Sequence, residues 1–334
     1  MVKIIIADCD TATSVARKSI IKNNADYRET KRQKKSSVLV IKNILEGETD
    51  LSPLNSLNEI LAGYEPSDVY FINSDVNLFE NLQAWYNKTN NNKNVNNTIS
   101  IPLALLDRTR KYINDRKVIK QFVSPSNAIK HFISLNAVPK LHRFQTLDHI
   151  FDKGYQNKGH ISWLERNQPT PANWIKNAKA FDGKQRILDF DNLQIDQNHN
   201  QEIMPEQYNE AMFDFVLESV TSDTSIFITE KTWKPLLHGK MFLAYGPKGM
   251  YKYLKSIGFE MYEEFIDYSF DELDVAERYQ GYLANIDKIC NLQLGELKNM
   301  FKEKNIIEKV RHNIERAESI EIPSWEDELR KRLV

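Results

Sequence analysis

Short, continuous apolar runs recur along the chain and predict the strands of parallel sheets. Residues 2–7 (VKIIIA), 38–41 (VLVI) and 68–75 (DVYFINSD, with a polar end) form one series, and 213–217 (FDFVL) and 241–245 (MFLAY) belong to a second. Apolar runs without alternation are typical of strands covered on both faces, as in α/β proteins. We therefore expect an α/β fold.

The strands and helices predicted around the second series follow the order found in half of a nucleotide-binding domain. Residues 132–136 predict its first strand, and 141–151 predict a helix because their apolar positions have helical spacing. After the strand at 213–217, a polar loop, a helix start at 229–234 and the strand at 241–245 follow. Strand, loop, helix and strand in this order are typical of such folds.

The remaining predicted segments are mostly helical or polar, and together with the strands they suggest how the chain divides into domains. The further segments predicted from the pattern are helices at 13–24, 54–62, 78–86 and 250–257, a strand at 160–163, a surface loop at 87–97, an insertion with little regular structure at 165–208, a helical part at 274–318 and an amphipathic tail at 325–333. We expect an N-terminal domain over residues 1–125, a second domain over 126–310 and a helical tail over 311–334.

Composition limits the classes of protein. The 334 residues are 41% apolar and 27% charged with a net charge of −1, which is normal for a globular protein of two domains. Cys9 and Cys290 alone give neither a disulfide framework nor a thiolate metal site. The start of the chain does not resemble a signal peptide, so we expect a cytoplasmic protein.

Three aspartates lie at the carboxyl ends of strands of the first series. Asp8 and Asp10 come after residues 2–7, and Asp75 ends residues 68–75. The carboxyl ends of strands carry function in α/β folds, so these side chains are candidate functional residues. Asp8 and Asp10 also fit a helix N-cap and loop carboxylates.

Charged residues gather where the helix after residue 228 begins. Thr229, Glu230, Lys231 and Lys234 lie at this helix start, where backbone N–H groups bind phosphates. A first-turn carboxylate and surface lysines without a ligand fit the same pattern. Trp233 is expected in the core.

Three blocks of the sequence carry a family resemblance. They are residues 132–136 (FISLN), 139–154 (PKLHRFQTLDHIFDKG) and 227–249 (FITEKTWKPLLHGKMFLAYGPKG). Together they resemble nucleotide-sugar glycosyltransferases of the GT-B type, which implies two Rossmann-like domains that face a cleft, with the donor domain over residues 126–310. The third block is similar to the donor site of the α-1,3-fucosyltransferase group. Phage and virus glycosyltransferases carry similar blocks. Ala137 stands where related sequences tend to have a basic residue.

The resemblance implies roles in binding a nucleotide-sugar donor. Glu230 would accept hydrogen bonds from the ribose hydroxyls. Lys231 or Lys234 would face the diphosphate, joined by Arg143. Tyr245 and Gly246 would line the nucleotide pocket beside Thr229. Fixed cations and a helix N-terminus would stabilise the leaving diphosphate without a metal or another cofactor.

The resemblance also implies where the acceptor and the base lie. In a GT-B protein the general base comes from the N-terminal domain, which makes Asp10, Asp8 and Asp75 the candidates. The triplet from Asp8 to Asp10 has the form of a metal-binding DxD motif. It follows a strand on the acceptor side, however, so we expect no metal there.

Charge distribution suggests an acceptor. Residues 1–125 carry 18 basic and 14 acidic side chains, with basic clusters at 28–35 and 108–120. This excess of positive charge fits a polyanionic acceptor, namely duplex DNA that carries hydroxymethylated or already glycosylated cytosine. The chain would then be a phage enzyme that modifies DNA in the host cytoplasm. The abundance of Lys, Asn and Ile is typical of AT-rich genomes such as those of many phages. Transfer to a cell-surface glycan or a lipopolysaccharide precursor, or an inactive nucleotide- or DNA-binding module, fits the sequence too.

Overall fold

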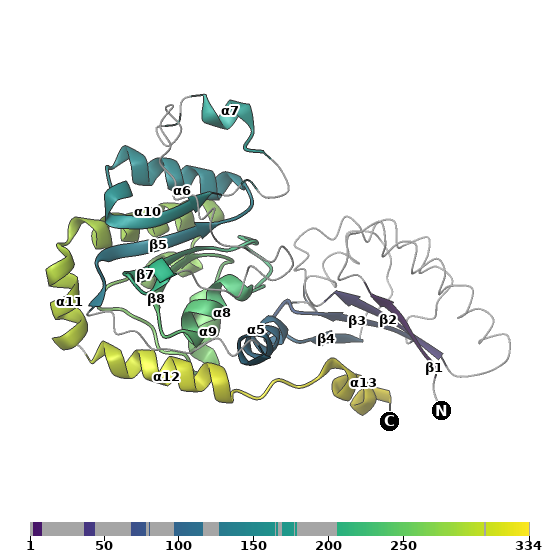
Figure 1. Ribbon diagram of the computed structural model, residues 1–334. Coiled ribbons are helices and arrows are strands. Elements are labelled where there is room, and N and C mark those ends of the chain that lie inside the picture. Colours follow the sequence, from purple (N-terminus) through teal and green to yellow (C-terminus); the bar gives the residue numbers. More distant parts are fainter. Residues whose placement is uncertain are drawn as a thin grey trace. The chain divides into compact units, whose positions relative to one another are not determined.

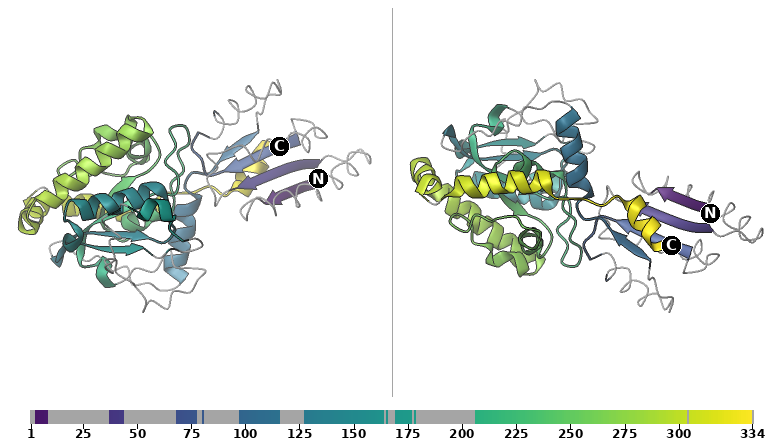
Figure 2. Two further views of the ribbon diagram at one scale, coloured as in Figure 1. Left: turned by 90° about the horizontal axis from the view of Figure 1, so that it is seen from above. Right: turned by 90° about the horizontal axis from the view of Figure 1, so that it is seen from below.

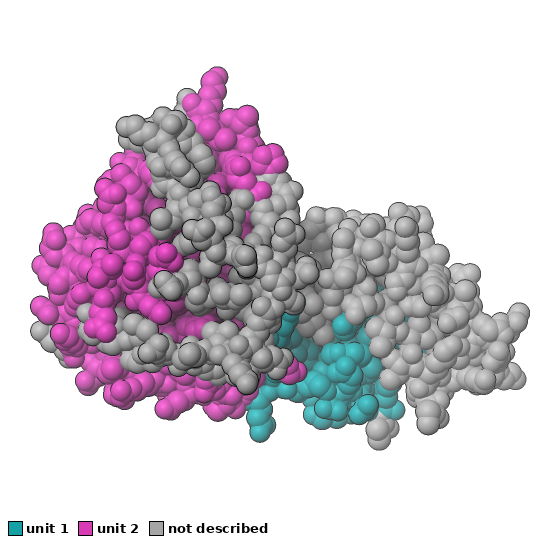
Figure 3. Space-filling model, viewed as in Figure 1, with its two compact units in different colours: residues 1–108, 222–227, 321–334 teal, residues 109–221, 228–320 magenta. Residues whose placement is uncertain are grey.

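The computed structural model divides the chain into two compact units. It describes residues 3–8, 37–43, 68–77, 80, 97–115, 127–163, 165, 169–176, 178, 206–303 and 305–333. Unit 1 consists of Met1–Arg108, Ser222–Phe227 and Glu321–Val334, and unit 2 consists of Thr109–Thr221 and Ile228–Ile320 (Figure 3). A short loop segment and the C-terminal end of the chain thus join unit 1. Each unit is described by itself.

Unit 1 contains a sheet of four parallel strands in the order β1-β2-β3-β4. The strands are β1 (Lys3–Asp8), β2 (Ser37–Asn43), β3 (Val69–Asn73) and β4 (Thr98–Ser100). The predicted strands at 2–7, 38–41 and 68–75 are confirmed, although β3 is shorter than predicted and ends at Asn73. Strand β4 has only three residues and was not predicted. The predicted helices at 13–24 and 54–62 and nearly all of 78–86 and of the loop at 87–97 lie outside the described residues.

The C-terminal helix covers the unit 1 sheet. The segment α13 (Trp325–Leu333) is the amphipathic tail predicted at 325–333. Its Leu329 is 1% exposed and belongs to the core formed by β2, β3 and β4, and Trp325 packs against the same cluster. Figures 1 and 2 show α13 beside these strands. The tail is therefore part of the first core, although it comes last in the sequence.

Unit 2 contains the second parallel sheet, with the order β6-β5-β7-β8. Its strands are β5 (Lys130–Asn136), β6 (Gly159–Trp163), β7 (Ala211–Leu217) and β8 (Met241–Tyr245). The chain runs from β5 outward to β6 and then returns to place β7 on the other side of β5. Strand order therefore reverses between β5 and β7, which is where open α/β sheets bind ligands.

Helices cover both faces of the second sheet. They are α6 (Leu141–Asp152), α8 (Glu230–Leu237), α9 (Met250–Ser256) and α10 (Val275–Asn291). Figure 1 shows α6 and α10 on one face and α8 and α9 on the other. The placement of α6 and α8 on opposite faces follows from right-handed crossovers, because β5–α6–β6 and β7–α8–β8 run in opposite directions across the sheet.

The remaining elements are short or lie after α10. The helical stretch predicted at 274–318 forms α10, α11 (Leu294–Glu303) and α12 (Ile306–Ser319). Helix α5 (Ala104–Asp115) occupies part of the basic segment 108–120. Within the predicted insertion at 165–208, the described part holds only α7 (Ala172–Ile175) and a single 3-10 turn, Glu206–Tyr208.

The α/β class with two Rossmann-like parallel sheets is thus confirmed. No described helix combines the length and the apolarity needed to cross a membrane.

Candidate functional site

The candidate site lies at the carboxyl ends of β5 and β7, where strand order reverses. Helix α8 begins here, and Thr229 is its N-cap, accepting a hydrogen bond from the Lys231 N–H at 3.3 Å. The extended backbone of Thr229 is typical of a cap residue. The first turn of α8 therefore presents backbone N–H groups and its positive dipole end at this edge.

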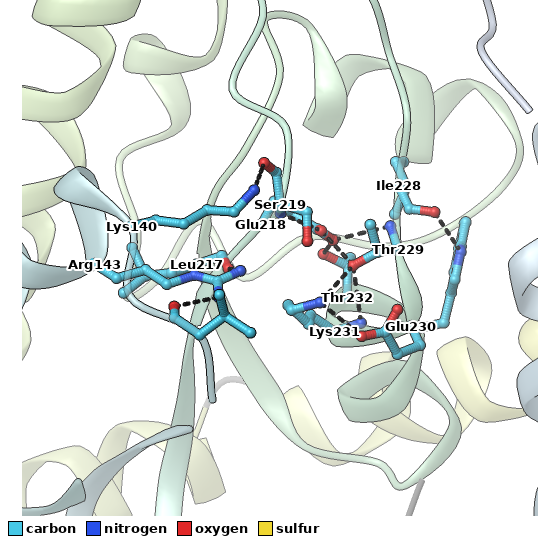
Figure 4. Close-up of polar contacts among 12 residues, drawn as sticks. Lys140, Arg143, Leu217, Glu218, Ser219, Ile228, Thr229, Glu230, Lys231 and Thr232 are labelled. Atoms are coloured by element: carbon cyan, nitrogen blue, oxygen red, sulfur yellow. Dashed lines mark hydrogen bonds and ion pairs between the residues drawn. The ribbon is translucent and has the colours of Figure 1, made fainter. Parts of the chain in front are cut away.

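Glu218 organises the start of α8. This fully buried residue directly follows β7, and its carboxylate accepts hydrogen bonds from the Thr229 hydroxyl (2.5 Å) and N–H (3.1 Å). It also accepts from the Thr232 hydroxyl (2.6 Å) and the Ser219 N–H (3.2 Å). Figure 4 shows the carboxylate between the strand end and the helix. Four donors satisfy a charge that burial would otherwise make costly.

Two basic residues follow β5 and reach the end of β7. Arg143, 3% exposed in the first turn of α6, donates from Nη1 to the Val138 carbonyl (3.0 Å) and from Nη2 to the Leu217 carbonyl (3.1 Å). Lys140 donates to the Ser219 carbonyl at 2.7 Å. Beyond the paired residues of β5 and β7, these two cations therefore join the segment after β5 to the carboxyl end of β7 (Figure 4).

Two polar atoms at this edge lack partners among the described residues. They are Arg143 Nε and Asn136 Oδ1, both buried. Burial lowers the pKa of Arg143, and the carboxylates of Glu218 and Glu230 act in the opposite direction. Buried donors and acceptors without partners are rare and require an explanation.

Glu230 and Lys231 form an ion pair on the first turn of α8. Glu230 Oε1 and Lys231 Nζ are 2.6 Å apart, with side chains 10% and 24% exposed. Burial raises the pKa of Glu230, but the charges of Lys231 and Lys234 outweigh it and leave the pKa below its ordinary value. The carboxylate is therefore an ionised hydrogen-bond acceptor at neutral pH.

Lys234 and Lys231 have different surroundings. Lys234 is 7% exposed, and its charge helps to lower the pKa of Glu230. The same charge only partly offsets the burial that raises the pKa of Asp214. Lys231 is the more accessible of the two at the helix start. Trp233 is fully buried and donates to the Ile228 carbonyl, so its predicted place in the core is confirmed.

Tyr245 and Gly246 end β8 at the same edge of the sheet. The Tyr245 hydroxyl donates to the Val275 carbonyl at 3.0 Å, and its ring packs edge-on to His142 with centroids 5.7 Å apart. The buried Arg278 donates from Nε to the Gly246 carbonyl at 3.1 Å. Burial and the Arg143 charge lower the pKa of His142 to about 3, so its imidazole is neutral.

The other predicted residues belong to unit 1. Asp75 is described and is 2% exposed, with its carboxylate in hydrogen bonds. Asp8 ends β1, and no contact of its side chain is described. Asp10 and the basic segment 28–35 lie outside the described residues. The role of each as a general base stays a prediction.

Sequence reasoning missed Glu218 and Asn136. Each is a single polar residue at a strand end, and its importance depends on partners far away in the sequence. A glutamate directly after an apolar run, followed by Thr-x-x-Thr at the next helix start, is the signal that could have identified Glu218. In the part of the chain that the structure describes, no three His, Cys, Asp or Glu side chains are grouped to hold a metal ion.

Comparisons with known proteins give distant structural likeness only. No family model matches the chain, and no curated protein matches it in sequence. An α,α-trehalose 6-phosphate synthase from Burkholderia multivorans is 9% identical, over 95% of this chain and 76% of that one, with a TM-score of 0.43. A UDP-forming α,α-trehalose-phosphate synthase from Burkholderia vietnamiensis is 10% identical, with coverages of 95% and 77% and a TM-score of 0.43. An α1,3-fucosyltransferase is 11% identical, with coverages of 90% and 88% and a TM-score of 0.31.

Proposed function

We propose that the chain is a glycosyltransferase that moves a sugar from a nucleotide-sugar donor to an acceptor hydroxyl. The observation that carries the proposal is the convergence of Arg143, Lys231 and the N-terminus of α8 at the reversal of strand order. These groups attract a phosphate, and the reversal point is where an open parallel sheet binds a ligand.

Two unpartnered atoms support this location for the diphosphate. Arg143 Nε is a buried donor, and a phosphate oxygen would accept its hydrogen bond. Asn136 Oδ1 is a buried acceptor, and a hydroxyl of the donor would satisfy it. A ligand that carries both phosphate oxygens and hydroxyl groups, as a nucleotide sugar does, matches both atoms.

The chemistry of the proposed reaction requires positive charge that is already in place. Negative charge develops on the leaving nucleoside diphosphate as its bond to the sugar breaks. Lys231, Arg143 and the α8 N–H groups would stabilise that charge without reorganising. Glu230, ionised beside Lys231, would accept hydrogen bonds from the ribose hydroxyls. Lys234, Thr229, Tyr245 and Gly246 would complete the surroundings of the nucleotide.

The acceptor is proposed from the sequence. Hydroxymethylated cytosine in phage DNA is the favoured acceptor, and a glycan or lipopolysaccharide precursor is the alternative. In the basic segment 108–120, Arg110 donates to the backbone carbonyls of Glu318 and Ile320. Retardation of hydroxymethylated duplex DNA in a gel at low salt is the test; without retardation, the DNA acceptor is wrong.

Release of nucleoside diphosphate from UDP-, GDP-, ADP- and CDP-sugars tests the catalytic proposal. The purified chain should hydrolyse at least one donor slowly without an acceptor, and Glu230→Ala should abolish the release. Glu328→Ala is a matched control, because Glu328 also pairs with a lysine at 2.6 Å, in α13. Release by Glu230→Ala at the rate of the unmutated chain would contradict the assigned site.

A further inference from the structure

Asn136, the last residue of β5, is bound to both strands that flank β5. Its N–H donates to the Ser162 hydroxyl of β6 at 2.9 Å, and its Nδ2 donates to the Ser134 hydroxyl at 3.1 Å. The Ser134 hydroxyl donates in turn to the Phe215 carbonyl of β7 at 3.2 Å. All of these residues belong to unit 2. The Asn136 side chain is therefore fixed at the edge where strand order reverses.

The same hydrogen bonds determine which end of the Asn136 amide faces away from Ser134. A carbonyl oxygen can only accept, so the single hydroxyl proton of Ser134 is used toward Phe215. The Ser134 hydroxyl oxygen must then accept from Asn136, and only the amide nitrogen can donate. Nδ2 also lies 3.5 Å from the Ser134 carbonyl, a second acceptor on the same side. A flipped amide would place Oδ1 against both acceptors, so the network assigns Oδ1 to the side away from Ser134.

Asn136 differs in one atom from two other buried asparagines of unit 2. Asn285 Oδ1 accepts from the Asp267 N–H and Asn313 Oδ1 accepts from the Glu260 N–H, each at 2.8 Å. Asn285 and Asn313 are 4% and 1% exposed, and Asn136 is 3% exposed. At the same depth, Asn136 Oδ1 has no partner among the described residues. A buried acceptor of this kind calls for a hydrogen-bond donor from outside the chain.

We propose that Asn136 is a specificity-determining residue whose Oδ1 accepts a hydrogen bond from a hydroxyl group of the bound nucleotide or nucleotide sugar. The inference rests on the proposed function of this edge. A hydroxyl can donate a hydrogen, whereas an ionised phosphate oxygen only accepts and would face the lone pairs of Oδ1. Asn136 therefore selects ligands that carry a hydroxyl over pyrophosphate. The hydroxyl comes from the ribose or from the transferred sugar, which binding measurements distinguish.

Asn136→Ala tests this selection by calorimetry with matched ligands. They are whichever of UDP, GDP, ADP and CDP binds most tightly, its 2′- and 3′-deoxy analogues, its nucleotide sugars and pyrophosphate. The variant should raise the Kd of the ligands that carry the hydroxyl by about tenfold and leave that of pyrophosphate within about twofold.

The pattern across the ligands identifies the hydroxyl. An increase in Kd for both the nucleoside diphosphate and the nucleotide sugar assigns the hydroxyl to the ribose. The matching deoxy analogue should then bind Asn136→Ala and the unmutated chain alike, because it lacks the group that Oδ1 would bind. An increase for the nucleotide sugar alone assigns the hydroxyl to the transferred sugar. Either pattern supports the inference.

Two further variants separate recognition from structural support. Ser134→Ala keeps Oδ1 but removes the acceptor that orients the Asn136 amide, so it should raise the same Kd values by about threefold. Asn285→Ala is the matched control, because it removes a buried asparagine that bonds to the Asp267 and Gly281 backbone. It should lower the melting temperature and leave every Kd unchanged.

The outcomes that contradict the inference differ from the one that contradicts the proposed function. Unchanged affinity of Asn136→Ala for every ligand would overturn the inference and make an internal water the partner of Oδ1. Equal weakening of all ligands, pyrophosphate included, would also overturn it, because a purely structural role affects every ligand alike. Absence of binding of every nucleotide and nucleotide sugar by the unmutated chain would instead contradict the proposed function, and the inference with it.

Discussion

The Glu218 carboxylate accepts a hydrogen bond from the Thr232 hydroxyl at 2.6 Å and thereby joins the end of β7 to the first turn of α8. Because Glu218 is fully buried and also binds Ser219 and Thr229, the position of the α8 N-terminus depends on this one side chain. Strand end and helix start, which together form the proposed diphosphate site, are thus fixed by a residue that need not touch the donor.

Glu218→Gln should therefore destabilise unit 2. The amide nitrogen of glutamine cannot accept from the Ser219 N–H, which leaves buried donors facing each other. We expect a loss of about 1–3 kcal/mol in the free energy of unfolding, measured by urea denaturation. The exposed Glu326→Gln in α13 is the control and should change stability little. Equal stability of both variants would show that the Glu218 contacts do not hold α8.

Arg143→Lys should weaken nucleotide binding despite keeping the charge. The planar guanidinium donates to both the Val138 and the Leu217 carbonyl and still has the Nε–H group free of a partner. A lysine ammonium cannot place three donors in this geometry. We expect at least about a tenfold increase in Kd for the preferred nucleoside diphosphate, measured by calorimetry. Arg311→Lys, on an exposed side chain of α12, should leave Kd unchanged. Unaltered affinity in Arg143→Lys would remove Arg143 from the proposed site.

Asp214 should make unit 2 more stable as the pH falls from 7 to 5. Burial raises its pKa to about 6, although Lys234, Tyr208 and Lys240 act in the opposite direction. Between pH 4 and 6 the folded state therefore keeps a proton on Asp214 that the unfolded state has released. This contribution to stability is fully present below pH 4 and is lost as the pH rises through 6. The gain between pH 7 and 5 should be about 1–2 kcal/mol.

Urea denaturation at both pH values measures this contribution. Asp214→Asn should abolish the gain, because the asparagine amide does not titrate in this range. The exposed Asp327→Asn should retain the pH dependence of the unmutated chain. If Asp214→Asn kept the same dependence, the proton would have to bind elsewhere.

Gly246→Ala should disturb the same edge of the sheet by steric overlap. A Cβ at this position would lie 2.7 Å from Met250 Sδ and 3.3 Å from Glu218 Cγ. We expect a loss of about 1–3 kcal/mol in the free energy of unfolding. Gly295→Ala in α11 meets nothing within 4 Å and should stabilise slightly. Thermal denaturation compares the two, and a neutral Gly246→Ala would show that Met250 adapts freely.

The sequence predicted the strands well because their apolar runs are local. The strand predicted at 241–245 has the bounds of β8, and the helix predicted at 141–151 differs from α6 by one residue. The three residues of β4 were missed because they are too few to show a pattern. The reversal of strand order between β5 and β7 is a property of the whole sheet, which no single segment encodes.

The candidate site was predictable only as far as it is contiguous. Thr229, Glu230 and Lys231 are neighbours at a helix start, and their charges indicated an anion site from the sequence. Glu218 was missed because its role depends on hydrogen bonds to residues eleven and fourteen positions later. Asp75 was predicted as a base from its place after a strand, whereas its loop partners lie some 150 positions away.

Thermal denaturation with nucleotides and nucleotide sugars tests the central claim most directly. A donor at about 100 times its Kd should raise the melting temperature by roughly 5–10 °C, because it binds only the folded chain. Lys231→Ala should lose most of this shift. Lys331→Ala, which breaks the matched 2.6 Å pair with Glu328 in α13, should retain it. No shift with any nucleotide or nucleotide sugar, or an equal shift in Lys231→Ala, would contradict a donor site at the start of α8.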